Sequence, residues 1–505
     1  MIEASEKWKE IHNRFLLPET FVEIDCAVTE VGVQEEATAS GTSEAVFSDI
    51  EQILGRSEMS ELPKYATLEH NLWALDGSRG LLPDSGPYEN AGYVSDIDQS
   101  GSVTLTLREE HTVAIPGVTI VWSSEYGEYP EVFTVTAYNG SVKAAETTVT
   151  GNRQQRCLVD LEIINYDRVV VTVHNWCLPV RRPRIDYVFL GHILTFTKDD
   201  ILSFTHEQYG DILTGEIPKY SIEFSLDNTD QRWNPSNPTG LERYLSERQK
   251  LSVRYGMDID GTIEWIPGGT FYLSEWSAPS NGLEARFVAR DVFEFLLSVD
   301  MGSYVFGSLE HLASWATDTL IPKDSYVSID LSLDNYSAEY PGDSTAAEIV
   351  QKCANAACCV LRYGRDGILH IEPLEKYLSD FRIPLSLAYS HPEITLSKPL
   401  KKVSVEYGED DPYELEVFAS GETQTVSNSF VTSLEQAAMV AEWVRDALQS
   451  RKTISGEFRA DPRLDLYDMV TVESKFGAFS PVVLTEITYT FNGSFAASYV
   501  GRVLE

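Results

Sequence analysis

The chain has 505 residues, too many for one hydrophobic core, so we expect several domains. With 43% hydrophobic and 11% aromatic residues, its composition is typical of folded domains, and the many Tyr and Phe residues favour β structure. The formal charge of −39, from 78 acidic against 39 basic residues, argues against wrapping nucleic acid or docking on anionic lipid, because both need Lys and Arg.

Neither a membrane segment nor a disulfide framework is predicted. No run of about 18 apolar residues occurs, so we expect no membrane anchor, and the charged start lacks the apolar centre of a signal peptide. The six cysteines show no CxxC spacing, so buried, reduced thiols in a protein that folds in a cytosol are expected.

Residues 1–64 are predicted to hold a helix, a strand and a linker. Apolar residues at helical spacing predict an amphipathic helix over residues 5–17, which Pro18 ends. A strand is expected between residues 21 and 28, and it is interpreted as the first strand of a small barrel. Residues 34–64 lack clear periodicity and are interpreted as an excursion over the surface.

Residues 65–190 are predicted to form an antiparallel β-sandwich. Strands recur there at regular spacing with turn residues between them, which is the pattern of two packed sheets. The predicted strands are 103–107, 118–122, 133–138, 145–151, 158–163, 169–176 and 185–191.

Three segments of this region resemble the galactose-binding-like sandwich of surface carbohydrate-binding modules. They are LWALDGS (72–78), TIVWSSEYGEYPEVFTVTAYNG (119–140) and NYDRVVVTVHNWCLPVRRPRIDYVFLG (165–191). In such sandwiches, aromatic rings and charged groups on the end loops hold a sugar. The candidate glycan-binding residues are Trp122, Tyr126, Tyr129, Trp176, Arg181, Arg182 and Arg184.

A structural role is the alternative for these side chains. Trp122 and Trp176 both end predicted strands, so they can plug the sandwich core instead of facing a ligand. The three arginines can bridge acidic neighbours on an adjoining domain. The sequence leaves both interpretations open.

Residues 191–300 contain an alternating strand followed by a loop rich in Asn-Pro pairs. Apolar residues recur at every second position over residues 220–226, which predicts a strand with one buried face. The prolines fix their own φ and keep the preceding residues extended, so the loop is predicted to be rigid. A hairpin at Asn281-Gly282 and a short helix after Asp291 are also expected.

Residues 301–400 are predicted to form a small α/β domain. Ser308 is the expected cap of one helix, and Thr345 with Glu348 forms a capping-box pattern at the start of another. The second helix leads into a β-hairpin that turns at residues 365–367.

Residues 401–505 are predicted to hold an alternating strand, a helix and a terminal hairpin. Thr432 and Glu435 are the expected capping pair of the helix, and Asn492-Gly493 is the expected turn of the hairpin. Between them, the pattern Asp-Pro-x-Leu followed by Asp-x-Val-x-Val comprises Asp461, Pro462, Leu464, Asp468, Val470 and Val472.

Taken in order, these segments resemble the hub proteins of bacteriophage tail tips and baseplates, the late-control-protein-like hub family. The match rests on FSLDNTD (224–230), RWNPSNPTG (232–240), ERQKLSVRYG (247–256), GGTFYLSEW (268–276) and the Asp-Pro pattern at 461. The resemblance implies a mainly β fold with an α+β insert: two hub-type β-barrels at 191–300 and 401–505, a small α/β domain and the antiparallel β-sandwich. It assigns an assembly loop to Asp227, Asn228, Trp233, Asn234, Pro235, Asn237 and Pro238.

The function implied by this resemblance is structural. We expect a homotrimeric ring in the virion tail tip, assembled in the bacterial host cytoplasm, which joins the tail tube or distal tail protein to other baseplate and tail-fibre proteins. Phage DNA would pass through its channel without specific binding, because acidic walls repel phosphates. The alternative is a carbohydrate-binding adhesin whose sandwich recognises a host cell-surface glycan.

No catalytic site, metal site or cofactor is predicted. GxSxG, HExxH, P-loop and GxGxxG patterns are absent from the sequence, so we expect no enzyme. Asp227 and Asp230 lack EF-hand spacing, and we favour their capping of loop amides over cation binding. A cell-wall-degrading enzyme remains a third hypothesis, since an acidic chain always contains carboxylate pairs.

Overall fold

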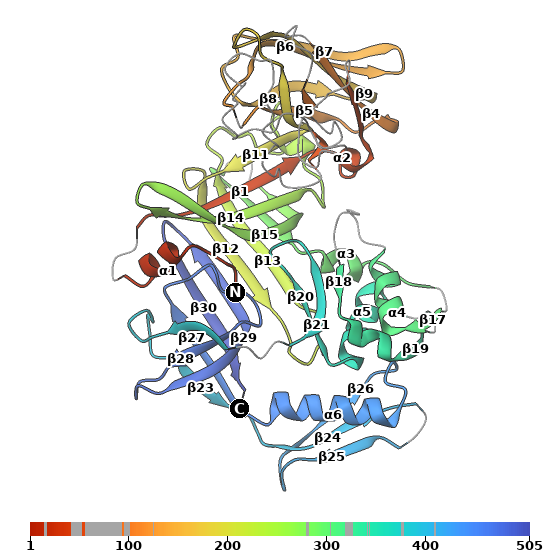
Figure 1. Cartoon of the computed structure of the whole chain (residues 1–505), viewed down its shortest axis with the longest axis vertical. Coiled ribbons are helices and arrows are strands. Elements are labelled where there is room, and N and C mark those ends of the chain that lie inside the picture. The colour runs from red at the N-terminus through yellow and green to blue at the C-terminus, as the bar shows by residue number, and fades with distance from the viewer. Residues whose placement is uncertain are drawn as a thin grey trace, which may run out of the picture. The chain divides into compact units, whose positions relative to one another are not determined.

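The structure is a computed structural model of the chain and shows a mainly β protein with several, mostly antiparallel sheets and few helices (Figure 1). It describes residues 1–14, 18–41, 53–55, 93–94, 101–124, 126–278, 282–302, 305–318, 327–340, 342, 344–374, 378–408 and 411–504.

The chain divides into two compact units. Unit 1 comprises residues 1–24, 196–231 and 251–505, and unit 2 comprises residues 25–195 and 232–250. The predicted sandwich region therefore falls in unit 2, while the α/β region and the C-terminal region fall in unit 1.

The largest sheet has 13 strands. Its path is β11-β1-β14-β15-β16-β13-β12-β29-β30-β27-β23, and β28, paired with β22 and β29, branches from it. The strands are β1 (Thr20–Val28), β11 (His192–Phe196), β12 (Ile201–Tyr209), β13 (Lys219–Asp227), β14 (Lys250–Ile259), β15 (Thr262–Ser277), β16 (Glu284–Arg290), β22 (Leu378–Ile383), β23 (Glu393–Leu396), β27 (Lys452–Phe458), β28 (Met469–Glu473), β29 (Phe479–Phe491) and β30 (Phe495–Val503).

The prediction of two separate closed barrels is corrected by this strand order. Among the described strands the path ends at β11 and β23, and no sheet closes on itself. The reason is the antiparallel pairing of β12 with β29, in which Phe204 lies opposite Phe491 and Tyr209 opposite Glu486. Because β13 already occupies the other edge of β12, this pairing makes one sheet of the two predicted barrel regions.

The strand alternation predicted for residues 220–226 is confirmed in β13. Tyr220, Ile222, Phe224 and Leu226 are buried, whereas Glu223 is exposed. The predicted hairpin between β15 and β16 is antiparallel as expected, and the Asn281 of its turn lies outside the described residues.

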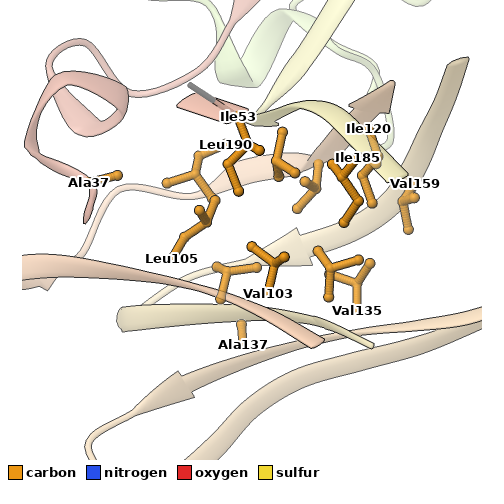
Figure 2. Packing of buried hydrophobic residues seen from close by; sticks show 14 of the residues in the cluster. Ala37, Ile53, Val103, Leu105, Ile120, Val135, Ala137, Val159, Ile185 and Leu190 are labelled. Carbon is orange, nitrogen blue, oxygen red and sulfur yellow. The ribbon is translucent and has the colours of Figure 1, made fainter. Parts of the chain in front are cut away.

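Unit 2 contains two antiparallel sheets that share a core. One has the order β3-β10-β5-β8 and the other β2-β4-β9-β6-β7. Val103 of one sheet and Ile120 of the other belong to the same buried cluster, and Figure 2 shows these two side chains within it. The strands are β2 (Thr38–Gly41), β3 (Tyr93–Val94), β4 (Gly101–His111), β5 (Ile115–Trp122), β6 (Pro130–Asn139), β7 (Val142–Thr150), β8 (Arg156–Ile163), β9 (Tyr166–Trp176) and β10 (Arg184–Leu190).

The region after residue 290 of unit 1 forms a small α/β assembly. Ser308 caps its helix as predicted, and Thr345 and Glu348 form the predicted capping box. A hairpin turns at residues 364–368 between β20 and β21, also as predicted. The elements are α3 (Phe293–Leu297), β17 (Val305–Ser308), α4 (Leu309–Thr317), β18 (Val327–Ile329), the 3-10 helix η3 (Leu331–Asn335), β19 (Ser337–Tyr340), α5 (Ala346–Ala356), β20 (Cys359–Tyr363) and β21 (Leu369–Pro373).

A helix and a separate three-stranded sheet follow in the C-terminal region. Helix α6 (Leu434–Leu448) lies against the sheet β25-β24-β26 (Figure 1), which comprises β24 (Leu400–Glu406), β25 (Tyr413–Glu416) and β26 (Glu422–Ser427). The predicted cap at Thr432 is wrong by one residue. Ser433 accepts a hydrogen bond from the Gln436 amide at 3.2 Å, and the Gln436 side chain accepts the Thr432 amide at 2.9 Å. Gln436 occupies the third helical position and can therefore reach back.

The N-terminal helix is shorter than predicted. Helix α1 (Glu6–His12) is capped by Ser5, whose hydroxyl accepts the Trp8 amide at 3.1 Å. Asn13 ends it by donating a side-chain hydrogen bond to the Lys9 carbonyl at 2.9 Å. The rest of the predicted helix, residues 15–17, lies outside the described residues.

Candidate functional site

The two tryptophans of the predicted glycan site lie in the sandwich core of unit 2. Trp122 is 0% exposed and Trp176 is 3% exposed. Their rings meet edge to face at 6.2 Å, and Trp122 also contacts Phe133 at 5.0 Å. No ring face of Trp122 is therefore available to stack on a sugar, and the core-plugging alternative describes these two side chains.

A buried ion pair lies beside Trp176. The Glu128 carboxylate, 2% exposed, accepts hydrogen bonds from the Trp176 indole N–H at 2.8 Å and from Arg181 Nε at 2.7 Å. Two guanidinium groups lie over the Tyr126 ring, that of Arg181 at 5.3 Å and that of Arg184 at 4.8 Å from the ring centroid. Arg181 thus finds its acidic partner within the sandwich itself, where mutual charge offsets the cost of burial.

The remaining predicted glycan contacts are half-buried. Tyr129 packs against the sandwich core, and Tyr126 lies beside Arg181 and Arg184, the residues on either side of the 182–183 segment. Arg184 itself is buried, at 6% exposed. The glycan-binding prediction therefore depends on Tyr126, Tyr129 and Arg182, and it stays a prediction.

Sequence reasoning missed Asp186, which lies at this end of the sandwich. Its Oδ2 accepts hydrogen bonds from the Ser124 amide and the Ser124 hydroxyl, both at 2.6 Å. Burial raises the pKa of Asp186, and the two hydrogen bonds from Ser124 partly oppose that rise. An aspartate within an apolar strand was the only sequence signal for it.

The first part of the predicted assembly loop caps its own backbone in unit 1. Asp227 accepts hydrogen bonds from the amide and hydroxyl of Thr229 at 3.0 and 3.2 Å, as the sequence predicted. Asn228 is 0% exposed, and its backbone N–H donates a hydrogen bond to the Leu283 carbonyl at 2.7 Å. Buried Asn228 therefore fixes the end of β13.

The second part of the loop is built from two consecutive Asn turns in unit 2. Asn234 Oδ1 accepts the Ser236 amide at 2.9 Å, and Asn237 Oδ1 accepts the Thr239 amide at 3.1 Å. Trp233 is 1% exposed and anchors the turns, whereas Pro235 and Pro238 are exposed. The buried Trp233 side chain thus holds a rigid loop whose two prolines face the solvent.

Residues 459–468, which connect β27 to β28, form a loop in unit 1 that side chains from several other elements bind. Tyr489 donates its hydroxyl to the carbonyls of Asp461 and Leu464, at 3.2 and 2.7 Å. His12 of α1 lies 3.5 Å from the buried Asp461 carboxylate, which also pairs with Arg463. The Asp-Pro-x-Leu pattern in the sequence therefore marks a loop that ties α1 and β29 together.

Arg365, at the tip of the β20–β21 hairpin, inserts into this same loop. Its guanidinium donates to the carbonyls of Pro462 and Leu464 and lies over the rings of Tyr255 and Tyr489, at 5.7 and 5.6 Å. Asp465 faces its Nε at 3.6 Å. The hairpin is thus bound to the sheet through one buried cation.

The described residues hold neither a metal-ligand cluster nor a spanning helix. No group of three or more His, Cys, Asp or Glu residues among them is arranged to hold a metal ion. Within the same ranges, none of the helices has the length and apolar character needed to cross a membrane.

Comparisons with known proteins give structural similarity to phage tail proteins. No family model and no curated protein matches the chain. The prophage MuSo2 43 kDa tail protein from Shewanella oneidensis is 14% identical, with a TM-score of 0.45 over 62% of this chain and 94% of that one. A tail protein from Neisseria meningitidis MC58 is 12% identical, with a TM-score of 0.45 over 62% and 94% of the two chains.

A third structure of this kind is prophage tail protein gp18 from Listeria monocytogenes EGD-e. It is 14% identical and has a TM-score of 0.41 over 61% of this chain and 90% of that chain. All three TM-scores are below 0.5.

Proposed function

We propose that this chain is a structural hub of a phage tail tip or baseplate, which forms a trimeric ring around a channel and joins the tail tube to the tip. The observation that carries the proposal is the position of the hub-like segments. FSLDNTD and GGTFYLSEW contribute to β13 and β15, and the Asp-Pro pattern leads into β28. Both groups of strands belong to one sheet, joined where β12 pairs with β29.

Rigidity within unit 1 supports a load-transmitting role. The 459–468 loop receives Arg365 from the small α/β assembly, His12 from α1 and Tyr489 from β29. Arg365 and Tyr489 donate to backbone carbonyls, and His12 Nε2 lies 3.0 Å from the Ala460 carbonyl oxygen, so directional contacts fix these parts in addition to apolar packing. A ring that joins two parts of a tail requires such fixed geometry.

An open strand offers a contact between subunits. β23 ends the path of the largest sheet, and its other edge has no partner strand among the described residues. Ile394 and Leu396 are 53% and 59% exposed on it. Exposed apolar residues on an open edge favour pairing with another chain, and a ring of subunits covers such edges.

Acidic side chains on the central strands support an inert channel wall. Glu207 on β12, Glu223 on β13 and Glu486 on β29 are exposed, and the strand register places them on one face of the sheet. Carboxylates along this face would repel the phosphates of a passing genome and prevent its adhesion. We place this face toward the channel.

Electron microscopy tests the proposal. Purified chain, alone and mixed with the cognate tube protein, should give rings with threefold symmetry that enclose a passage and stack on the end of the tube. Single, unclosed particles in both samples would contradict it.

The second candidate is a glycan-binding adhesin, favoured by one observation. The half-buried Tyr126, Tyr129 and Arg182 combine aromatic rings with a cation, and the buried Arg181 and Arg184 lie over the Tyr126 ring at 5.3 and 4.8 Å. Calorimetric titration of the full chain with host cell-wall oligosaccharides should detect binding that Tyr126→Ala abolishes. If no titration produces heat of binding, the adhesin candidate is excluded and the hub function stands as the one proposal.

A further inference from the structure

Helix α2 (Val33–Glu36) lies at one side of the sandwich core in unit 2. Val33 and the following Ala37 are 0% exposed and belong to the core cluster, in which Figure 2 labels Ala37. A four-residue helix has almost no intrinsic stability, and its N-cap, Gly32, contributes no side-chain hydrogen bond. β2 follows directly and pairs with β4 from Thr38 onward, so the C-terminal end of α2 is held by a backbone strand pairing. The N-terminal part of α2 depends on side chains that bind it to the two sheets.

The first anchor of α2 is Gln34, which binds the β10 side. Its amide nitrogen donates to the carbonyls of Leu54 and Val188 at 2.8 and 2.9 Å, and its oxygen accepts the Leu190 amide at 3.0 Å. A carboxamide does not change its charge between about pH 5 and pH 8. This anchor is therefore independent of pH.

The second anchor is His111, at the end of β4. Its Nδ1 lies 3.1 Å from a carboxylate oxygen of Glu30, which precedes α2. Its Nε2 lies 3.5 Å from a carboxylate oxygen of Glu36, the last residue of the helix. The imidazole, 9% exposed, thus lies between two carboxylates, one on each ring nitrogen.

The number of N–H groups on the His111 ring decides how many of the two carboxylates it can bind. Within the described part of the chain, His111 Nε2 and the facing oxygens of Glu30 and Glu36 are buried and have no aligned hydrogen-bond partner. Neutral imidazole carries one N–H, so it serves one carboxylate and turns a lone pair toward the other. Imidazolium carries two N–H groups and serves both.

A metal ion cannot replace the proton here. The two carboxylates face opposite nitrogens of the ring, so they share no common point with one nitrogen, and the described residues contain no metal-ligand cluster.

We propose that His111 is a proton-operated clasp that holds α2 against β4, closed when the ring is protonated and open when it is neutral. Gln34 keeps the helix attached to β10 in both states, so the clasp controls only one side of the helix. Opening exposes the core around Val33 to water without unfolding the sandwich, while the pairing of β2 with β4 keeps Ala37 in place.

The other groups around His111 do not supply this response. The Tyr166 ring of β9 packs at 6.0 Å, and burial and then Glu30 raise the pKa of its phenol, so the phenol remains neutral. On β4 itself, Arg108, Glu109 and Glu110 are exposed and therefore screened by solvent. The clasp is thus formed by His111, Glu30 and Glu36.

Hydrogen exchange of the full chain tests the clasp. Amide protection factors over residues 33–37, corrected for intrinsic exchange, are measured from about pH 5 to about pH 8. We expect them to fall about tenfold across this interval, the loss of one hydrogen bond to a charged group. His111→Asn should abolish the pH dependence, and Glu36→Gln should reduce it, because the Gln amide can donate to the neutral ring.

His174→Asn is the matched control. His174 is an exposed histidine on β9 in the same unit, bonded to the Thr134 hydroxyl at 2.8 Å, and its loss should leave the pH dependence of α2 unchanged. Protection that does not vary with pH in the unsubstituted chain overturns the proposal. An unchanged pH response in Glu36→Gln overturns it as well, and this variant decides the matter even where His111→Asn fails to fold.

Discussion

His206 on β12 lies directly opposite Tyr489 on β29, with ring centroids 6.0 Å apart. This pair joins the two halves of the largest sheet, and its surroundings are polar although fully buried. His206 Nδ1 lies 2.6 Å from the Tyr255 hydroxyl, and Arg365 lies over the rings of Tyr255 and Tyr489. Burial first, and then the Arg365 charge, lower the pKa of His206 well below its usual value. A neutral histidine and a buried arginine therefore lie together where β12 pairs with β29.

Replacing Arg365 should destabilise unit 1 strongly. Arg365→Ala removes the donors to the Pro462 and Leu464 carbonyls and takes from buried Asp465 the nearer of two cations, since Arg362 lies 4.0 Å away. We expect a loss of about 3 kcal/mol or more in the free energy of unfolding, measured by chemical denaturation. The exposed Arg382→Ala is the control and should cost less than about 0.5 kcal/mol. Equal effects of the two variants would contradict the role given to the hairpin tip.

Asp291 should make stability decrease as pH rises. Burial raises the pKa of Asp291 to about 8, against the lowering effect of the Tyr220 and Phe293 amides. A folded-state pKa above the unfolded value means that the contribution is complete below about pH 4 and is lost as pH rises toward about 8. The expected slope is about −1.4 kcal/mol per pH unit in that window.

The measurement is chemical denaturation at successive pH values from 4 to 8. Asp291→Asn, which has no titrating group, should remove this slope, whereas exposed Asp199→Asn should retain it. A slope of the same size in the Asp291→Asn variant would exclude Asp291 as its origin.

Gly421, before β26, should not tolerate a side chain. Its φ is +143°, and an added Cβ would lie 2.0 Å from the Pro399 carbonyl oxygen. Gly421→Ala should cost about 2 kcal/mol or more, seen as lower protection of β24 and β26 in hydrogen exchange. Gly493→Ala is the matched control, because its φ is +101° and no atom lies within 4 Å of the added Cβ. The smaller loss of stability in Gly493→Ala measures the cost of backbone strain without a steric clash.

Charge reversal on the proposed channel face should create DNA affinity. Glu207→Lys with Glu486→Lys replaces two exposed carboxylates on paired strands and should leave stability within about 0.5 kcal/mol per site. We expect the assembled ring to retard DNA on a gel in a salt-dependent manner. Glu435→Lys with Glu442→Lys makes the same charge change on exposed positions of α6 and should cause no retardation. Retardation by both double variants would argue against the assignment of the face.

Local sequence patterns predicted the local structure well. Alternation over residues 220–226 predicted β13, and the residue pair Thr345 and Glu348 predicted the capping box of α5, because each depends only on neighbours in the chain. The shift of the α6 cap to Ser433 shows the limit of such patterns, since Glu435 and Gln436 offer the same kind of side chain.

Long-range pairings were not predictable from the sequence. Nothing in β12 or β29 indicates that these strands pair with each other, so two barrels were expected where one sheet occurs. Arg365 occupies an Arg-Asp-Gly turn, a pattern of exposed hairpins, yet it is buried against Leu464. Glu128 and Arg181 form their ion pair from separate loops without any recognisable spacing.

The proposed ring can be tested by the molar mass of the purified full chain, measured by light scattering alone and with its tube protein. We expect three copies of the 56.5 kDa chain to associate, either in isolation or on addition of the tube protein. A mass of 56.5 kDa for the chain under both conditions would contradict the proposed ring.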